Sequence, residues 1–143
     1  MTKRKRTYHL GLDIGSTTVK LVILDEKCNL IYSKYKRHLS NIQMTFKDIV
    51  HEAYEKLGNI SMTAAVTGSA GLSISNWLNL DFVQEVIAST KTVETYIPET
   101  DVAIELGGED AKITYFDQSL EQRMNGTCAG GTGASVCSKD AIW

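Results

Sequence analysis

The sequence is poor in proline and cysteine and has no excess of charge of one sign. Its net charge of −2 over 143 residues does not favour a nucleic-acid partner. The basic residues 1–6 are followed by no apolar stretch of signal-peptide length before Asp13, which argues against a secretion signal or membrane anchor. Three cysteines are an odd number, and without a secretory signal structural disulfides are not expected. We therefore expect a cytoplasmic protein with no membrane or nucleic-acid partner.

The pattern of apolar residues and turn residues predicts an α/β protein. Three strands in succession indicate an antiparallel meander, and the single proline, Pro98, ends the last predicted helix. We expect a tail over residues 1–7, one nucleotide-binding subdomain over residues 8–116, and the start of a further segment over residues 117–143. The predicted strands are residues 8–14, 19–25, 30–35, 62–67, 101–106 and 111–116, and the predicted helices are residues 45–57 and 81–96.

The first candidate site is the turn that follows the strand 8–14. Glycine permits a tight bend, hydroxyl and backbone N–H groups can face an anion, and a lysine can neutralise charge nearby. A carboxylate at the strand end suits Mg²⁺, which prefers oxygen ligands. By itself this pattern also occurs in hairpins with polar turns. The predicted phosphate-binding residues are Asp13, Gly15, Ser16, Thr17, Thr18 and Lys20, with Asp13 also holding Mg²⁺ or its water.

A second turn repeats this arrangement after the strand 101–106. Two consecutive glycines, Gly107 and Gly108, let the backbone approach a phosphate closely. Glu105 and Asp110 are the candidate catalytic residues, because hydrolysis of a phosphate needs a carboxylate that orients the attacking water. Asp110 is also a candidate ligand of the nucleotide and its metal, whereas Lys112 is expected to be a solvated residue at a strand edge. Together the two turns predict a nucleotide-binding protein.

A third feature places Cys128 one residue before a glycine-rich turn in the segment MNGTCAGGTG. If this turn opens a helix, its N–H groups favour a thiolate, which suits a metal–sulfur ligand. A single cysteine beside glycines is also compatible with an ordinary buried thiol. Cys28, in a turn between two strands, is expected to be structural or incidental, and the role of Cys137 stays open.

The order of elements and the segment DIGST resemble one ribonuclease-H-like half of the actin, sugar-kinase and heat-shock-chaperone superfamily. This resemblance implies a mixed sheet with a three-strand meander flanked by helices. In that superfamily two such halves close around a nucleotide.

The segments DIGSTTVK, ELGGEDAKI and MNGTCAGGTG, in this order, resemble the ATP-dependent activators of 2-hydroxyacyl-CoA dehydratases and the related benzoyl-CoA reductase ATPases. The resemblance implies ATP, Mg²⁺ and an oxygen-sensitive [4Fe–4S] cluster shared across a homodimer of anaerobic metabolism, with Cys128 as a cluster ligand. It also implies electron transfer from ferredoxin or flavodoxin to a dehydratase component. The family's second cluster cysteine lies beyond Gly133. We therefore expect this chain to be the N-terminal part of a longer activator and to hydrolyse ATP weakly on its own.

Two alternatives remain open from the residues alone. The first turn is also found in small-molecule kinases of the same superfamily, which have no need of a glycine-flanked cysteine. A non-catalytic, actin-like nucleotide-sensing module would need a polymerising surface, and no such surface is evident in the sequence.

Overall fold

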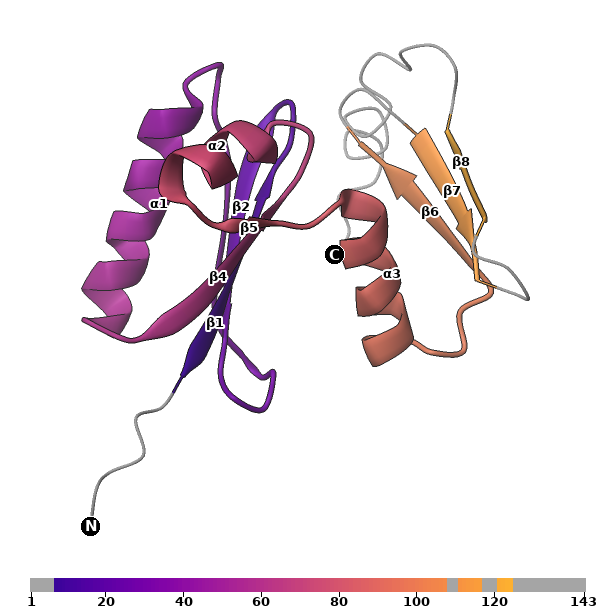
Figure 1. Cartoon of the computed structure of the whole chain (residues 1–143), viewed down its shortest axis with the longest axis horizontal. Coiled ribbons are helices and arrows are strands. Elements are labelled where there is room, and N and C mark those ends of the chain that lie inside the picture. Colours follow the sequence, from indigo (N-terminus) through magenta and orange to yellow (C-terminus); the bar gives the residue numbers. More distant parts are fainter. Residues whose placement is uncertain (1–6, 108–110, 117–120, 125–143) are drawn as a thin grey trace, which may run out of the picture. The chain divides into compact units, whose positions relative to one another are not determined.

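The computed structural model describes residues 7–107, 111–116 and 121–124 (Figure 1). The chain divides into two compact units, Met1–Glu85 and Val86–Trp143. In the described residues the first unit has a five-stranded sheet and the second has a three-stranded sheet.

The first unit opens with the predicted antiparallel meander. In its second strand Val19, Leu21 and Ile23 are buried, whereas Lys20 and Val22 between them are exposed. Because successive side chains of a strand point to opposite faces, this alternation builds one apolar face of the sheet. The three strands are β1 (Tyr8–Ile14), β2 (Thr18–Leu24) and β3 (Leu30–Arg37).

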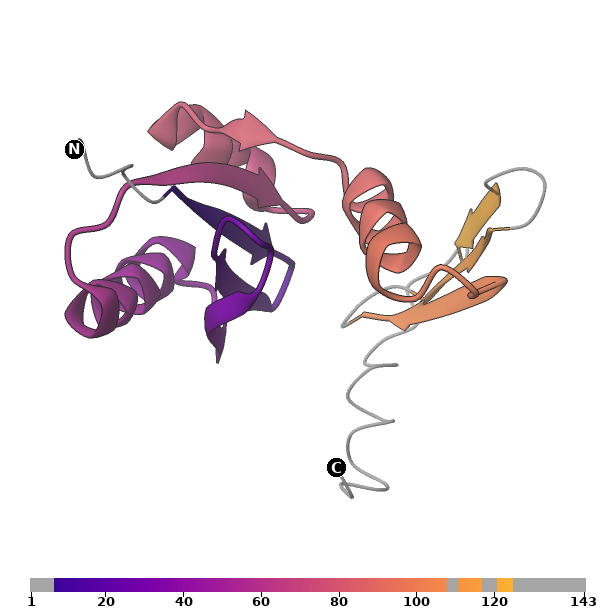
Figure 2. The ribbon, with the colours of Figure 1, turned by 90° about the horizontal axis from the view of Figure 1, so that it is seen from below.

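Two helices and two further strands complete this unit. The strand β4 (Met62–Thr67) pairs parallel with β1, and the short β5 (Asp81–Phe82) pairs parallel with β4, so the order is β3-β2-β1-β4-β5. The mixed sheet predicted from the sequence is thereby confirmed. The helices α1 (Ile42–Leu57) and α2 (Gly71–Leu78) supply Ile49 and Ile74 to the core, and Figure 2 shows α1 along one face of the sheet. The core residues are Leu12, Ile14, Val19, Leu21, Ile23, Tyr32, Ile49, Ala53, Val66 and Ile74.

Ionic contacts fasten α1 to the sheet. The Glu52 carboxylate lies 2.6 Å from Lys34 Nζ and 2.5 Å from Lys36 Nζ, both on β3. Hydrogen bonds from Lys34 and then Lys36 lower the pKa of Glu52 to about 2. The helix begins three residues before the predicted start, because the Asn41 side chain caps it by accepting a hydrogen bond from the Met44 N–H.

The prediction of one helix over residues 81–96 is wrong in its first part. Asp81 and Phe82 extend the sheet beside β4, and the Val83 N–H continues this pairing by donating to the Val66 carbonyl at 2.8 Å. The preceding α2 was not predicted. It begins at Gly71, where a Cβ would lie only 3.1 Å from a Val66 methyl group, so the glycine allows the helix to approach the strand.

The second unit contains α3 (Glu85–Tyr96), whose first residue lies at the boundary between the units, and a second antiparallel meander. The predicted hairpin is confirmed, since β6 (Val102–Leu106) pairs with β7 (Ala111–Tyr115). A third strand, β8 (Glu121–Met124), was not predicted and pairs with β7 on its other side. The strand β6 therefore belongs to a second sheet and does not extend the first one. None of the helices in the described ranges combines the length and the apolar character needed to cross a membrane.

Candidate functional site

The first predicted turn is a compact hairpin between β1 and β2. The Gly15 N–H donates to the Thr18 carbonyl at 2.9 Å, and Ser16 and Thr17 at the tip are exposed. Asp13 and Lys20 are directly opposite each other in the strand register, and Lys20 Nζ lies 2.7 Å from the Asp13 carboxylate. The structure thus brings together all six residues predicted in this turn: Asp13, Gly15, Ser16, Thr17, Thr18 and Lys20.

The end of β4 supports this hairpin from the side. Gly68 has φ of 100°, and a Cβ there would lie 2.3 Å from the Ile14 carbonyl oxygen, so a side chain would force the two backbones apart. The Ala70 N–H donates to the same carbonyl at 2.9 Å. The loop after β4 therefore packs directly against the end of β1.

Thr67 adds an unused polar group at this edge. It pairs with Asp13 in the parallel register of β1 and β4, and its buried Oγ1 has no hydrogen-bond partner among the described residues. Ligands of α/β sheets bind outside the carboxyl ends of parallel strands, where Asp13 and Thr67 both lie. Because a buried hydroxyl without a partner is unfavourable, this atom is suited to bind a water molecule or a ligand.

The second predicted turn has the same arrangement in the second unit. Glu105 stands next to last in β6, as Asp13 does in β1, and each acid is followed after one residue by a glycine. Lys112 is opposite Glu105 in the register of β6 and β7, and its Nζ lies 3.8 Å from the Glu105 carboxylate. Gly107 ends the described part of this turn, and the predicted residues Gly108 and Asp110 lie outside the described residues.

Two residues near these turns differ from the sequence prediction. The environment of Lys112 was predicted wrongly, and His38 was not predicted. Lys112 was expected to be solvated at a strand edge, but it lies on the central strand β7 with its side chain 12% exposed. The signal was present, because the separation of Glu105 and Lys112 equals that of Asp13 and Lys20. His38 is 6% exposed, and its ring Nε2 lies 3.2 Å from the Gly15 carbonyl oxygen.

No three His, Cys, Asp or Glu side chains gather into a metal-binding group within the described ranges. Cys28 lies exposed in the turn between β2 and β3. The predicted cluster ligand Cys128, as well as Cys137, lies outside the described residues.

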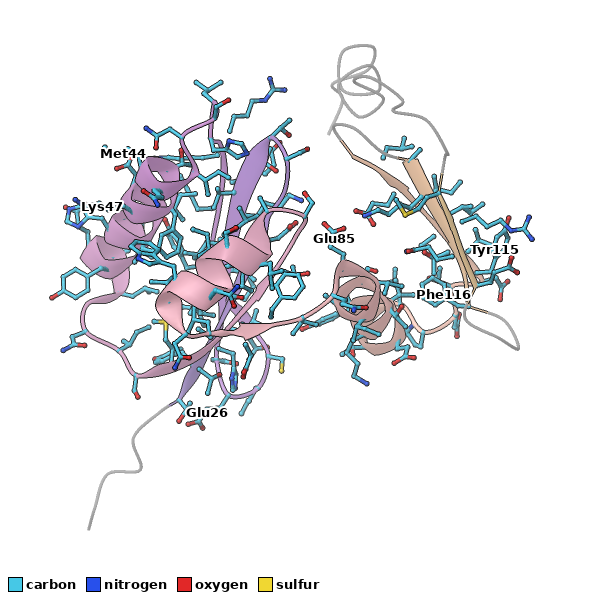
Figure 3. All side chains as sticks on the ribbon, turned by 45° about the horizontal axis from the view of Figure 1, so that its top comes forward. Glu26, Met44, Lys47, Glu85, Tyr115 and Phe116 are labelled. Carbon is cyan, nitrogen blue, oxygen red and sulfur yellow. The ribbon has the colours of Figure 1, made fainter. Side chains whose placement is uncertain are left out.

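A cavity formed by the described residues lies away from the hairpin. It has a volume of about 630 Å³ and is lined by side chains of α1, including Met44 and Tyr54, and by Trp77 of α2. Figure 3 shows Met44 and Lys47 pointing outward from α1. Because none of the predicted site residues lines this cavity, the chemistry of the acid–glycine turns is located elsewhere.

The sequence of the chain matches that of a known protein family. A model of the BadF/BadG/BcrA/BcrD ATPase family matches residues 10–138. The chain belongs to this family. The resemblance predicted from the three sequence segments is therefore confirmed, and members of this ATPase family are the appropriate comparison for the site.

Curated relatives of this ATPase family include the 2-hydroxyisocaproyl-CoA dehydratase activator of Clostridioides difficile. It is 31% identical over 130 residues, which are 88% of this chain and 48% of the relative. A solved structure of the activator of the 2-hydroxyisocaproyl-CoA dehydratase from Clostridium difficile, with bound ADPNP, has a TM-score of 0.74 at 29% identity. The match covers 92% of this chain and 50% of the chain in the solved structure. The chain thus spans about half the length of the curated relatives it matches.

A second solved structure supports the fold assignment. Component A of the (R)-2-hydroxyglutaryl-CoA dehydratase of Acidaminococcus fermentans has a TM-score of 0.76 at 22% identity, covering 90% of this chain and 51% of its own. This likeness shows that the two chains share their fold.

Proposed function

We propose that this chain is the nucleotide-binding N-terminal part of an ATP-dependent activator of a 2-hydroxyacyl-CoA dehydratase. The observation that carries the proposal is the Asp13–Thr17 turn with Lys20 opposite Asp13, within a chain of the BadF/BadG/BcrA/BcrD ATPase family. Support comes from the related activator of known structure with bound ADPNP, an analogue of ATP.

The residues of the first turn fit a magnesium-bound polyphosphate. A Cβ on Gly15 would contact only Thr18, at 3.8 Å, so the glycine leaves space at the bend. The exposed tip offers hydroxyl groups of Ser16 and Thr17 to phosphate oxygens, and Lys20 offers a positive charge. Asp13 is 32% exposed at its side chain and would hold Mg²⁺ or its water, with the Thr67 hydroxyl as a further oxygen at the same edge.

We propose the second turn as a further phosphate-binding element. Gly107 and Gly108 would bring backbone N–H groups near the phosphates, because neither glycine has a side chain to block the approach. Glu105 and Asp110 would orient the water that attacks the terminal phosphate. The described part of this turn supports the proposal through the Glu105–Lys112 pair, which repeats the Asp13–Lys20 pair.

We also propose that Cys128 binds a [4Fe–4S] cluster shared with a second copy of the chain. Such a cluster needs four ligands, which are usually thiolates. In a symmetric homodimer both subunits supply the same cysteines, so the number of thiolates available to a shared cluster is doubled. When bound, the cluster would supply a one-electron carrier between ferredoxin or flavodoxin and the dehydratase component. This part of the proposal rests on the sequence segment MNGTCAGGTG.

Nucleotide binding by the 143-residue chain tests the proposed function. We expect the wild-type chain to bind MgATP and Asp13→Asn to bind it at least about tenfold more weakly, because a neutral amide is a poorer ligand for Mg²⁺. Calorimetric titration measures both affinities. The control is Asp25→Asn, an acid at the opposite end of the same hairpin that should leave binding unchanged. Equal affinity of Asp13→Asn and wild type would refute the role of Asp13, and no binding by the wild type would refute the nucleotide site.

A further inference from the structure

We infer that His38 is a positioning residue that fixes the direction of the phosphate-binding turn between β1 and β2. The inference deepens the proposed function and rests on it for the identity of the ligand. His38 directly follows β3, and the residue is 6% exposed in the described structure. Buried polar side chains are normally hydrogen-bonded, so the partners of His38 indicate what holds it beside the turn.

His38 binds both ends of the turn from one side. Its backbone N–H donates to the Thr17 carbonyl at 3.1 Å, and its ring Nε2 lies 3.2 Å from the Gly15 carbonyl oxygen. Two peptide units of the turn are therefore held by one residue.

The planarity of the peptide bond gives these two contacts a consequence for ligand binding. In a trans peptide the C=O of one residue and the N–H of the next point in opposite directions. When the Gly15 and Thr17 carbonyls face His38, the N–H groups of Ser16 and Thr18 point away from it. His38 thereby aims two donors of the turn toward the side where an anion would bind.

A third hydrogen bond fixes which ring nitrogen carries the proton. The Ser40 N–H donates to His38 Nδ1 at 3.1 Å, so Nδ1 is an acceptor and has no hydrogen. In the neutral ring the hydrogen is then on Nε2, which donates it to the Gly15 carbonyl. The neutral ring therefore has one tautomer, in which Nδ1 accepts a hydrogen bond and Nε2 donates one.

The backbone after His38 is arranged to supply that third bond. Leu39 and Ser40 have φ of 45° and 65°, the left-handed region that residues other than glycine seldom adopt. The Asn41 N–H donates back to the His38 carbonyl at 2.6 Å and closes this bend. An uncommon conformation at two adjacent residues thus presents the Ser40 N–H to the ring, which supports a positioning role over simple filling of space.

Two substitutions separate the two functions of the ring. His38→Gln places an amide N–H near the position of Nε2 and can keep the bond to Gly15. His38→Asn places an amide oxygen near the position of Nδ1, so it can keep the bond from Ser40 but loses the donor to Gly15. The matched control is His51→Gln, because His51 is exposed on α1 and pairs with Glu55 on the same helix.

The experiment measures MgATP affinity of the 143-residue chain and the backbone mobility of Ser16 and Thr17 by ¹⁵N NMR relaxation. We expect His38→Asn to bind MgATP about three- to tenfold more weakly and to show a more mobile turn, as the loss of one hydrogen bond implies. His38→Gln should come within about twofold of wild type in both measurements, as should His51→Gln.

Equal affinity and equal mobility of His38→Asn and wild type would overturn the inference. Equal losses in both His38 variants would also overturn it, since they would reflect the volume of the ring and not its donor. If the wild type binds no nucleotide, the proposed function fails, and the mobility of Ser16 and Thr17 still decides whether His38 orders the turn.

Discussion

The Asp13–Lys20 pair and the Glu105–Lys112 pair lie at equivalent positions of the two meanders, but their lysine side chains differ in solvent exposure. The Lys20 side chain is 50% exposed, whereas that of Lys112 is 12% exposed. An exposed lysine can exchange its carboxylate partner for a phosphate at little cost, while a lysine with a packed stem keeps its position. We therefore propose that Lys20 contacts phosphate directly and that Lys112 maintains charge and orientation at Glu105.

The place of the first turn could be predicted from the sequence, because glycine and polar residues between two apolar segments indicate a short hairpin loop. The pairing of Asp13 with Lys20 is given by the strand register of the structure. His38 could not be predicted in the same way. Its contacts depend on the left-handed backbone at Leu39 and Ser40, which no local sequence pattern announces.

Cys128 carries the proposed cluster, and its replacement tests that assignment at the scale of one residue. In an activator that joins this chain to the remaining half found in its relatives, Cys128→Ala should lose most of the bound iron and sulfide after anaerobic reconstitution. In the proposed dimer the substitution would remove one thiolate from each subunit, and a cluster that lacks thiolate ligands is held less firmly. Iron and sulfide analysis with absorption spectroscopy measures the loss.

Cys28→Ala is the control for this measurement, since Cys28 lies exposed in the turn between β2 and β3. It should keep the iron content of the wild type. An unchanged cluster in Cys128→Ala would contradict the assignment.

At the scale of elements, long and strongly patterned segments were predictable, whereas short ones were not. The three strands of the first meander and α1 carry clear alternation or helical spacing. The helix α2 has eight residues, and Ile74 is its one large buried side chain, so it offers few positions from which helical spacing can be recognised. Its place follows from the tertiary contact of Gly71 with Val66, which local patterns do not contain.

The placement of β6 was missed for a related reason. Strand order follows from pairing between segments, and the sequence shows only that residues 102–106 favour a strand. The structure pairs β6 with β7 in the second sheet. The prediction of a hairpin held because it needed only neighbouring segments.

The attachment of α1 to β3 predicts a dependence of stability on pH. The pKa of Glu52 is lowered from 4.5 to about 2 by Lys34 and Lys36, so folding favours its ionised form. The stabilisation is complete above pH 4.5 and is lost as the pH falls toward 2. Unfolding by urea across this range should show a decline of stability for the wild type that is smaller in Glu52→Gln.

Glu55→Gln removes a carboxylate from the same helix, but one that pairs within α1 and not with the sheet. This control should decline in parallel with the wild type between pH 4.5 and 2. If Glu52→Gln also followed the wild-type curve, the contacts between α1 and β3 would not account for the acid sensitivity.

At the scale of the whole molecule, the chain contains the same arrangement of strands and acid–glycine turn twice. Each of its two units has three consecutive antiparallel strands in its described part, and in each an acid stands next to last in the first strand and a glycine directly follows that strand. The sequence showed the repeat of the turns, but the division into two sheets became evident only from the strand pairing. Each unit therefore carries one turn of the kind proposed to bind phosphate.

The most direct test of this account is an NMR titration of the isotope-labelled 143-residue chain with MgADPNP. We predict that amide signals of residues 13–20 and of residues 105–112 shift during the titration, because each of the two turns is proposed to bind phosphate. Shifts confined to other parts of the chain, such as the residues around Trp77 on α2, would contradict the account.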